Sequence, residues 1–65
     1  MNFTLSTGAV IDTADVQMTL LDKVNGNFAV IFKKVDSNGD PTFIQCDLQD
    51  CMDLLKLHQI RHEVR

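Results

Sequence analysis

The chain of 65 residues contains no tryptophan, no tyrosine, one proline and three glycines, and only one of its nine acidic residues is a glutamate. No apolar run approaches the roughly 20 residues that a membrane-spanning helix needs. The first residues contain neither the basic region nor the uninterrupted apolar stretch of a signal peptide. From these absences we expect a cytoplasmic protein that has no membrane partner.

The small number of prolines and glycines accompanies an ordinary apolar content of 45% and a net charge of −3, which together indicate a folded chain rather than a disordered one. A chain of this length buries only about 60% of the surface that it exposes when unfolded. It therefore has room for one thin core, and we predict a single small α+β domain over residues 1–65. A deep, enclosed active site does not fit in so small a core.

Groups that usually perform catalysis are also scarce. There are two histidines, both near the C-terminus, two serines, and no glycine-rich loop for phosphate. We therefore expect that the protein is not an enzyme and that it has no cofactor.

Basic residues are few and scattered along the chain: Lys23, Lys33, Lys34, Lys56, Arg61 and Arg65. Proteins that bind nucleic acid on their own gain affinity from clustered basic groups and commonly have an isoelectric point above about 9, whereas the value here is 4.9. The composition therefore disfavours direct binding of nucleic acid.

The two cysteines, Cys46 and Cys51, are too few for a disulfide-rich scaffold, and their spacing matches no paired zinc-ligand motif. We expect both to be reduced, small apolar core residues. A disulfide or a reactive thiol is the alternative.

The first half of the chain has the pattern of β-strands. The segment from Phe3 to Asp12 predicts one short strand or a small hairpin, and Val16–Val24 predicts a strand that leads into the Asn25-Gly26-Asn27 turn. Asn-Gly suits the two positive-φ positions of a type I′ turn, and residues 28–32 form the returning strand. After a loop at residues 36–41, residues 42–46 predict a third, antiparallel strand.

From Asp47 onward the apolar period changes to that of a helix, with Asp47 as N-cap and the basic residues near the C-terminal end, and we expect it to continue to about Arg65. The apolar stripe that would face the sheet contains Leu48, Cys51, Met52 and Leu55. The predicted fold class is α+β: an antiparallel β-sheet of three to five strands, built of hairpins and packed on one face by a C-terminal α-helix.

A second apolar facet of this helix, formed by Leu57, Ile60 and Val64, would lie nearly opposite the stripe that faces the sheet. One interpretation is that the N-terminal segment covers it. The other is that these three residues anchor a homodimer or a different partner protein.

Two further patterns could indicate metal. His58 and His62 have the i, i+4 spacing with which one helix binds a metal, but Cys51 would lie about 10 Å along the axis from His58, which excludes a shared zinc site. The loop that begins at Asp36 has Pro41 and Asp47 where a calcium-binding EF-hand needs glycine at position 6 and glutamate at position 12, and we interpret it as a hairpin loop. A site formed by His58 and His62 together with an outside carboxylate or a symmetry mate is the alternative, but we predict no metal site.

The acidic residues are the candidate partner-binding group. We expect them to gather around the loop and the N-terminus of the helix, either as caps and turn formers or as a patch that meets a basic groove on a partner. The residues of this predicted surface are Asp36, Asn38, Asp40, Asp47, Asp50 and Asp53.

The order of strand, Asn25-Gly26-Asn27 turn, strand, loop, strand and terminal helix between Val16 and Val64 resembles in outline the PC4-like fold of single-stranded DNA-binding proteins. The basic and aromatic binding positions of that family are not matched here, so no binding residue is carried over. In size, acidity and simplicity the chain is also similar to the small inhibitors that phages and mobile elements encode, anti-CRISPR proteins among them, although no shared motif supports this.

The leading hypothesis is therefore a small acidic protein-binding module of the phage-inhibitor type, which blocks a nucleic-acid-handling or defence protein in the host cytoplasm by stoichiometric occlusion. One alternative is a small single-stranded nucleic-acid-binding protein of PC4-like shape, which would use the sheet face around Lys23, Lys33, Lys34 and Phe43. Another is a structural homodimer or a subunit of a larger assembly.

Overall fold

The centre of the fold is a hairpin of β3 (Val16–Asp22) and β4 (Asn27–Val35), seen in a computed structural model that describes residues 1–65. The strands pair antiparallel from the Val16–Phe32 pair to the Asp22–Asn27 pair, with one irregularity near Val16. This confirms the hairpin that the alternating apolar residues predict. Most of the apolar residues of both strands are at least partly buried.

The prediction of a type I′ turn between these strands is wrong. The connection is a four-residue loop, residues 23–26, in which Gly26 has a positive φ of 70° and Asn25 does not. The Asp22 carboxylate accepts hydrogen bonds from the backbone N–H of Asn25 at 3.2 Å and from its side-chain amide at 2.9 Å. With Asp22 holding Asn25 in this way, the loop begins two residues earlier than a two-residue Asn25-Gly26 turn would and ends at the same residue, Gly26.

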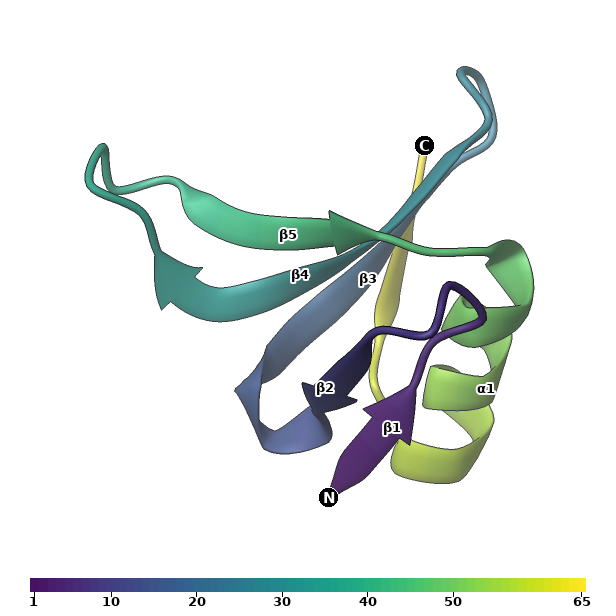
Figure 1. The fold of residues 1–65 in the computed structure, drawn as a ribbon. Coiled ribbons are helices and arrows are strands. Elements are labelled where there is room, and N and C mark those ends of the chain that lie inside the picture. The colour runs from purple at the N-terminus through teal and green to yellow at the C-terminus, as the bar shows by residue number, and fades with distance from the viewer.

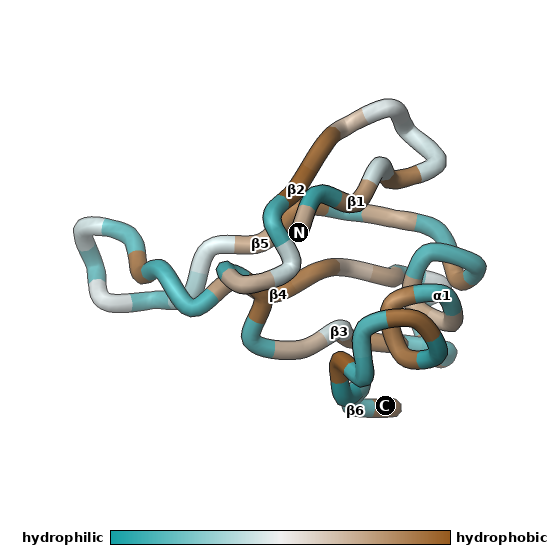
Figure 2. Tube along the Cα trace, turned by 90° about the horizontal axis from the view of Figure 1, so that it is seen from below, coloured by the Kyte–Doolittle hydropathy of each residue, from teal (hydrophilic) through white to brown (hydrophobic).

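The third strand, β5 (Pro41–Gln45), pairs antiparallel with β4, as predicted. Pro41 is its first residue, a position in an edge strand where the missing N–H costs little. The far ends of β4 and β5 extend beyond β3 as a two-stranded arm, whose loop is shown at the left of Figures 1 and 2 and is largely hydrophilic.

The helix α1 (Leu48–His58) begins after the predicted N-cap Asp47 but is much shorter than expected. Gln59 adopts the left-handed conformation with φ 53°, and its backbone N–H caps the carbonyls of Leu54 and Leu55. Ile60 then turns into the core and donates its N–H to the Leu54 carbonyl at 3.1 Å. The expectation of a helix to about Arg65 is therefore wrong, because burial of Ile60 ends it.

The last segment forms β6 (His62–Val64), which pairs parallel with β3. The main sheet therefore has the order β5-β4-β3-β6 and is mixed rather than purely antiparallel. Its α+β class, its hairpins and the helix packed against it agree with the prediction, whereas the parallel edge strand does not.

A second, small sheet is formed by β1 (Asn2–Thr4) and β2 (Val10–Asp12), which confirms the N-terminal hairpin. A single 3-10 turn at residues 13–15 connects it to β3, with the Asp12 carboxylate accepting from the Ala14 N–H. In Figure 1 this hairpin and α1 both lie in front of the main sheet, so one face of the sheet is covered by two elements.

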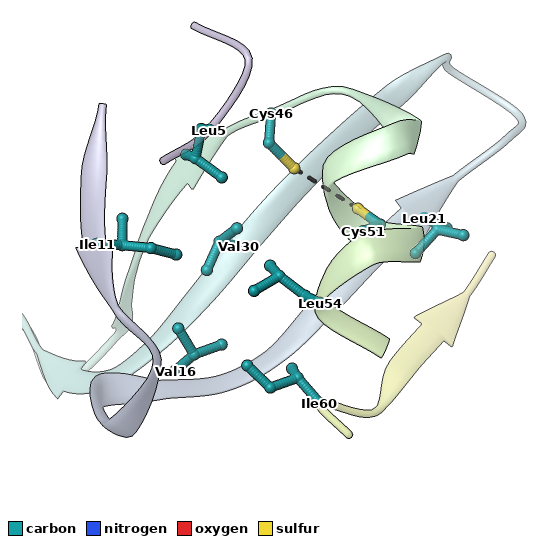
Figure 3. Packing of buried hydrophobic residues seen from close by; sticks show 9 residues of the cluster. All are labelled: Leu5, Ile11, Val16, Leu21, Val30, Cys46, Cys51, Leu54 and Ile60. Atoms are coloured by element: carbon teal, nitrogen blue, oxygen red, sulfur yellow. Dashed lines mark hydrogen bonds between the residues drawn. The ribbon is translucent and has the colours of Figure 1, made fainter. Parts of the chain in front are cut away.

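The core fills the space between that face and its two covers. Figure 3 shows Val30 of β4 surrounded by side chains from both ends of the chain. Leu54, rather than the predicted Leu48 and Leu55, is the fully buried leucine of α1, together with Cys51. The nine residues of the buried apolar cluster are Leu5, Ile11, Val16, Leu21, Val30, Cys46, Cys51, Leu54 and Ile60.

The chain contains no helix of sufficient length and apolar character to span a membrane.

Candidate functional surfaces

The uncovered face of the main sheet is apolar, and we call it the open face. The strand register places Leu20, Ala29 and Gln45 in one row across three strands and Met18, Ile31 and Phe43 in the next. Successive residues of a strand point to opposite faces, so these rows lie opposite the buried residues Thr19 and Val30. Neither α1 nor the N-terminal hairpin reaches this face (Figure 1).

A shallow hollow of about 310 Å³ lies on the open face. Its apolar lining includes Leu20, Ile31 and Phe43, and its polar lining comes from Asp22, Asn27 and Gln45. Phe43 is 65% exposed, although aromatic side chains usually supply most of a small core. An apolar hollow with polar residues at its margin is a typical protein-binding surface.

Charged groups border the open face at β6. Arg61 extends over it, with Nη2 3.9 Å from the sulfur of Met18. Glu63 is in register with Leu20 and is exposed. The open face is therefore apolar in the middle and charged at this edge.

The acidic loop of residues 36–40 lies at the tip of the arm. The Asp36 carboxylate is used inside the loop, where Oδ1 accepts from the backbone N–H of Asn38 at 2.9 Å and of Asp40 at 3.1 Å. The backbone N–H of Asp36 also donates to the Asp40 carbonyl. Asp36 therefore shapes the loop, whereas no hydrogen bond engages the exposed Asp40 carboxylate.

A second acidic group surrounds the N-terminus of α1. Asp50 is 4% exposed and accepts from the backbone N–H of Ser6 at 3.0 Å, from the Ser6 hydroxyl at 2.8 Å and from the Asp47 N–H at 3.1 Å. The Ser6 hydroxyl is also 2.7 Å from Asp47 Oδ2. These contacts fasten the N-terminal segment to the helix, so Asp50 is a structural group that a partner cannot reach.

The predicted acidic surface is thus divided into two parts. The five residues of β5 separate them, which corresponds to about 16 Å of extended strand. Figures 1 and 2 both show the arm and α1 at opposite ends of the molecule. Asp36, Asn38 and Asp40 lie at one end, and Asp47, Asp50 and Asp53 at the other, where Asp53 accepts from the Gln49 amide.

The three proposed anchors do not share a face either. Leu57 is 66% exposed near the end of α1, and Val64 is 52% exposed in β6. Ile60 is buried in the core between them. The prediction that these three residues share one helical facet is wrong, because the helix ends before Ile60.

The two histidines are separated for the same reason. His58 is the last residue of α1, where its ring contacts Phe3 edge-on at 5.8 Å between centroids. His62 belongs to β6, and its buried Nδ1 has no hydrogen-bond partner. No three side chains of His, Cys, Asp or Glu come together in an arrangement that could hold a metal ion.

The two thiols do come together. Cys46 and Cys51 are both buried and free, and their sulfur atoms are 3.5 Å apart. Burial away from water raises the pKa of both thiols, since the thiolate loses its hydration there. Neither thiol is a ready nucleophile in the folded protein at neutral pH.

Two features could not be predicted from the sequence. Both faces of the sheet have apolar residues, among them Met18, Leu20 and Ile31, so the sequence did not show which face the helix would leave open. The contact of Ser6 with Asp50 joins residues 44 positions apart, and no local pattern marks it.

Comparisons with protein-family models, with curated proteins and with solved structures found no match to this chain.

Proposed function

We propose that this protein is a binding module that acts by occupying the surface of another protein, with the open face as its contact surface. The observation that carries this proposal is the exposed Phe43 beside an apolar hollow on an uncovered sheet face. Buried aromatic anchors supply much of the energy of protein interfaces, and an exposed apolar hollow of this kind gains stability when a partner covers it.

The negative charge of this protein indicates which kind of partner surface would bind it. The chain carries a net charge of −3, and the free carboxylate of Asp40 lies three residues before Phe43. A partner that places an apolar side chain in the hollow would bring its neighbouring groups close to the acidic loop of residues 36–40 at the tip of the arm. A surface with basic residues around an apolar centre is therefore complementary to this face, and attraction between the two charges would speed their association.

Basic surfaces of this type are common on proteins that handle nucleic acid, since phosphates are their usual ligands. We propose that the module competes for such a surface in the host cytoplasm as a stoichiometric inhibitor of the phage type. The support for this part is the acidity and small size of the chain. The acidic contact would come from Asp40 and its loop, while Asp50 serves the fold.

A photo-crosslinking amino acid placed at residue 43 tests the contact surface. We expect a single cross-linked protein in cells when the probe replaces Phe43. The matched control is the same probe at Val24, which is 83% exposed at the tip of the β3–β4 hairpin and should give no specific product. Equal yields from both positions would contradict the open face as the contact surface.

The charge of the partner can be tested with the partner so identified. Asp40→Lys should weaken binding and reduce its salt dependence, whereas Asp53→Lys on α1, with the same change in charge, should leave both unchanged. Light scattering at low and moderate salt supplies a second control. A stable dimer that Phe43→Asp dissociates would show that a second copy, not a basic partner, covers this face.

Nucleic acid is the second candidate ligand. Lys33 and Lys34 are exposed on the arm near Phe43, and bases could stack on that ring. A filter-binding titration with single-stranded DNA at low salt distinguishes the two candidates, since the protein-binding proposal expects no retention.

A further inference from the structure

The chain has two cysteines, and the fold places them side by side at the N-terminus of α1. The Sγ atoms of Cys46 and Cys51 are 3.5 Å apart, and Figure 3 shows the two side chains pointing toward each other across the first turn of the helix. They are the only two thiols in the chain.

Their positions relative to the helix explain the contact. Asp47 is the N-cap, so Cys46 precedes the cap and Cys51 is the fourth residue of the helix. Apolar side chains at these two positions commonly touch and fix the angle at which the chain enters a helix, an arrangement called the hydrophobic staple. Here both members of the staple are cysteines.

We propose that Cys46 and Cys51 are a modification site, at which an intrachain disulfide converts this hydrophobic staple into a covalent one. The sulfur atoms need to approach by about 1.4 Å to reach the length of a disulfide bond. The helix cap already holds both residues in place, so side-chain rotation supplies most of this movement.

The oxidant is a small-molecule disulfide such as oxidised glutathione. One thiol loses its proton and attacks the oxidant, which forms a mixed disulfide and releases one thiolate. The second cysteine, also deprotonated, then attacks the mixed disulfide, forms the Cys46–Cys51 bond and releases the second thiolate. Two electrons and two protons leave the protein in total, and the oxidant becomes two thiols.

Burial controls when this reaction occurs. Cys46 is 8% exposed and Cys51 is fully buried, so the oxidant reaches Cys46 first and Cys51 completes the bond. The contacts of Ser6 with Asp47 and Asp50 hold the N-terminal segment over this end of the helix. The staple therefore oxidises when this end opens, and both thiols stay free under reducing conditions.

The full chain, incubated with oxidised glutathione and then examined by intact mass, tests the proposal. We expect the wild-type protein to lose two hydrogen atoms, to retain no glutathione and to remain monomeric. The matched variants Cys46→Ala and Cys51→Ala each lack a second thiol, so they should either accumulate a mixed disulfide or not react.

Thermal unfolding supplies an independent measurement. A disulfide that closes a short loop in native geometry should raise the unfolding midpoint of the wild-type protein by about 5 °C or more, and a reductant should reverse the change. The alanine variants should show no such increase. Ser6→Ala should speed the oxidation, since it loosens the cover.

Three results would overturn the proposal. The wild-type protein could keep two free thiols under conditions that oxidise the unfolded chain, it could accumulate mixed disulfides or linked dimers, or the oxidised form could unfold at a lower temperature than the reduced form.

Discussion

The two faces of the main sheet are built from the same three strands and have similar apolar residues, yet only one of them is covered. The closed face packs against α1 and the N-terminal hairpin, and it contains Val30 and Thr19 at full burial. The open face keeps Phe43 exposed beside its hollow. Hydrophobic character alone therefore does not identify the core of so small a chain, because the number of covering elements decides which face is buried.

The largest difference in the free energy of unfolding is expected when an apolar side chain is removed from each face in turn. Leu54→Ala leaves a cavity under α1 and should lower the free energy of unfolding by about 2–5 kcal/mol. Phe43→Ala removes a larger side chain from the open face and should change it by about 0.5 kcal/mol or less. Urea denaturation measures both, and equal losses would show that Phe43 is packed in solution.

The next largest change in the free energy of unfolding is expected from the hydrogen bonds that Asp50 accepts at the edge of the closed face. Asp50→Ala leaves the backbone N–H groups of Ser6 and Asp47 without their acceptor, and we expect a loss of about 1–3 kcal/mol in the free energy of unfolding. Asp53→Ala, on the same helix, removes one exposed contact and serves as the control. Similar losses in the two variants would contradict the structural role of Asp50.

A smaller effect, of opposite sign, is expected where the chain enters the closed face after α1. Gln59 has a φ of 53°, which costs a residue with a side chain more than it costs glycine. Gln59→Gly should therefore raise the free energy of unfolding by up to about 1 kcal/mol. Chemical denaturation of this variant and of Lys56→Gly, which should be destabilised within the helix, checks the assignment.

The smallest effect concerns the margin of the open face. Hydrogen bonds from Asn25 lower the pKa of Asp22 below its usual value of 3.8. The resulting stabilisation is present above that value and is lost as the pH falls through the lower pKa of the folded state. Asp22→Asn should therefore unfold slightly more easily than wild type at pH 7, with the difference vanishing in acid. A difference that grows at low pH would contradict this.

The sequence was sufficient to predict where several local elements lie, although not the type of turn between β3 and β4. The hairpin of β3 and β4, the return of β5 and the start of α1 at Asp47 all follow from residue patterns within a few positions. The end of the helix could not be predicted, because Gln59 occupies a left-handed position that glycine or asparagine usually marks. What places it there is the burial of Ile60, which depends on the rest of the core.

The candidate site was less predictable than the fold. Acidic residues were expected to form one surface, but β5 extends between them and the structure separates the arm from the helix. Prediction of the open face would have required knowing which apolar rows of the sheet lie under α1. The thiol pair is an intermediate case, since the N-cap prediction at Asp47 already implies contact between the residues on either side of the first turn.

The fastening of Ser6 to Asp50 has a consequence for how the protein folds. It joins positions 44 residues apart, and the pairing of β6 with β3 is also distant in sequence, whereas the two hairpins that include β4 are local. Chains rich in distant contacts fold more slowly, because long loops must close before those contacts contribute. We therefore expect the β4 hairpins to form early and the two ends of the chain to dock last, so that the thiols at the start of α1 become protected only in the final step of folding.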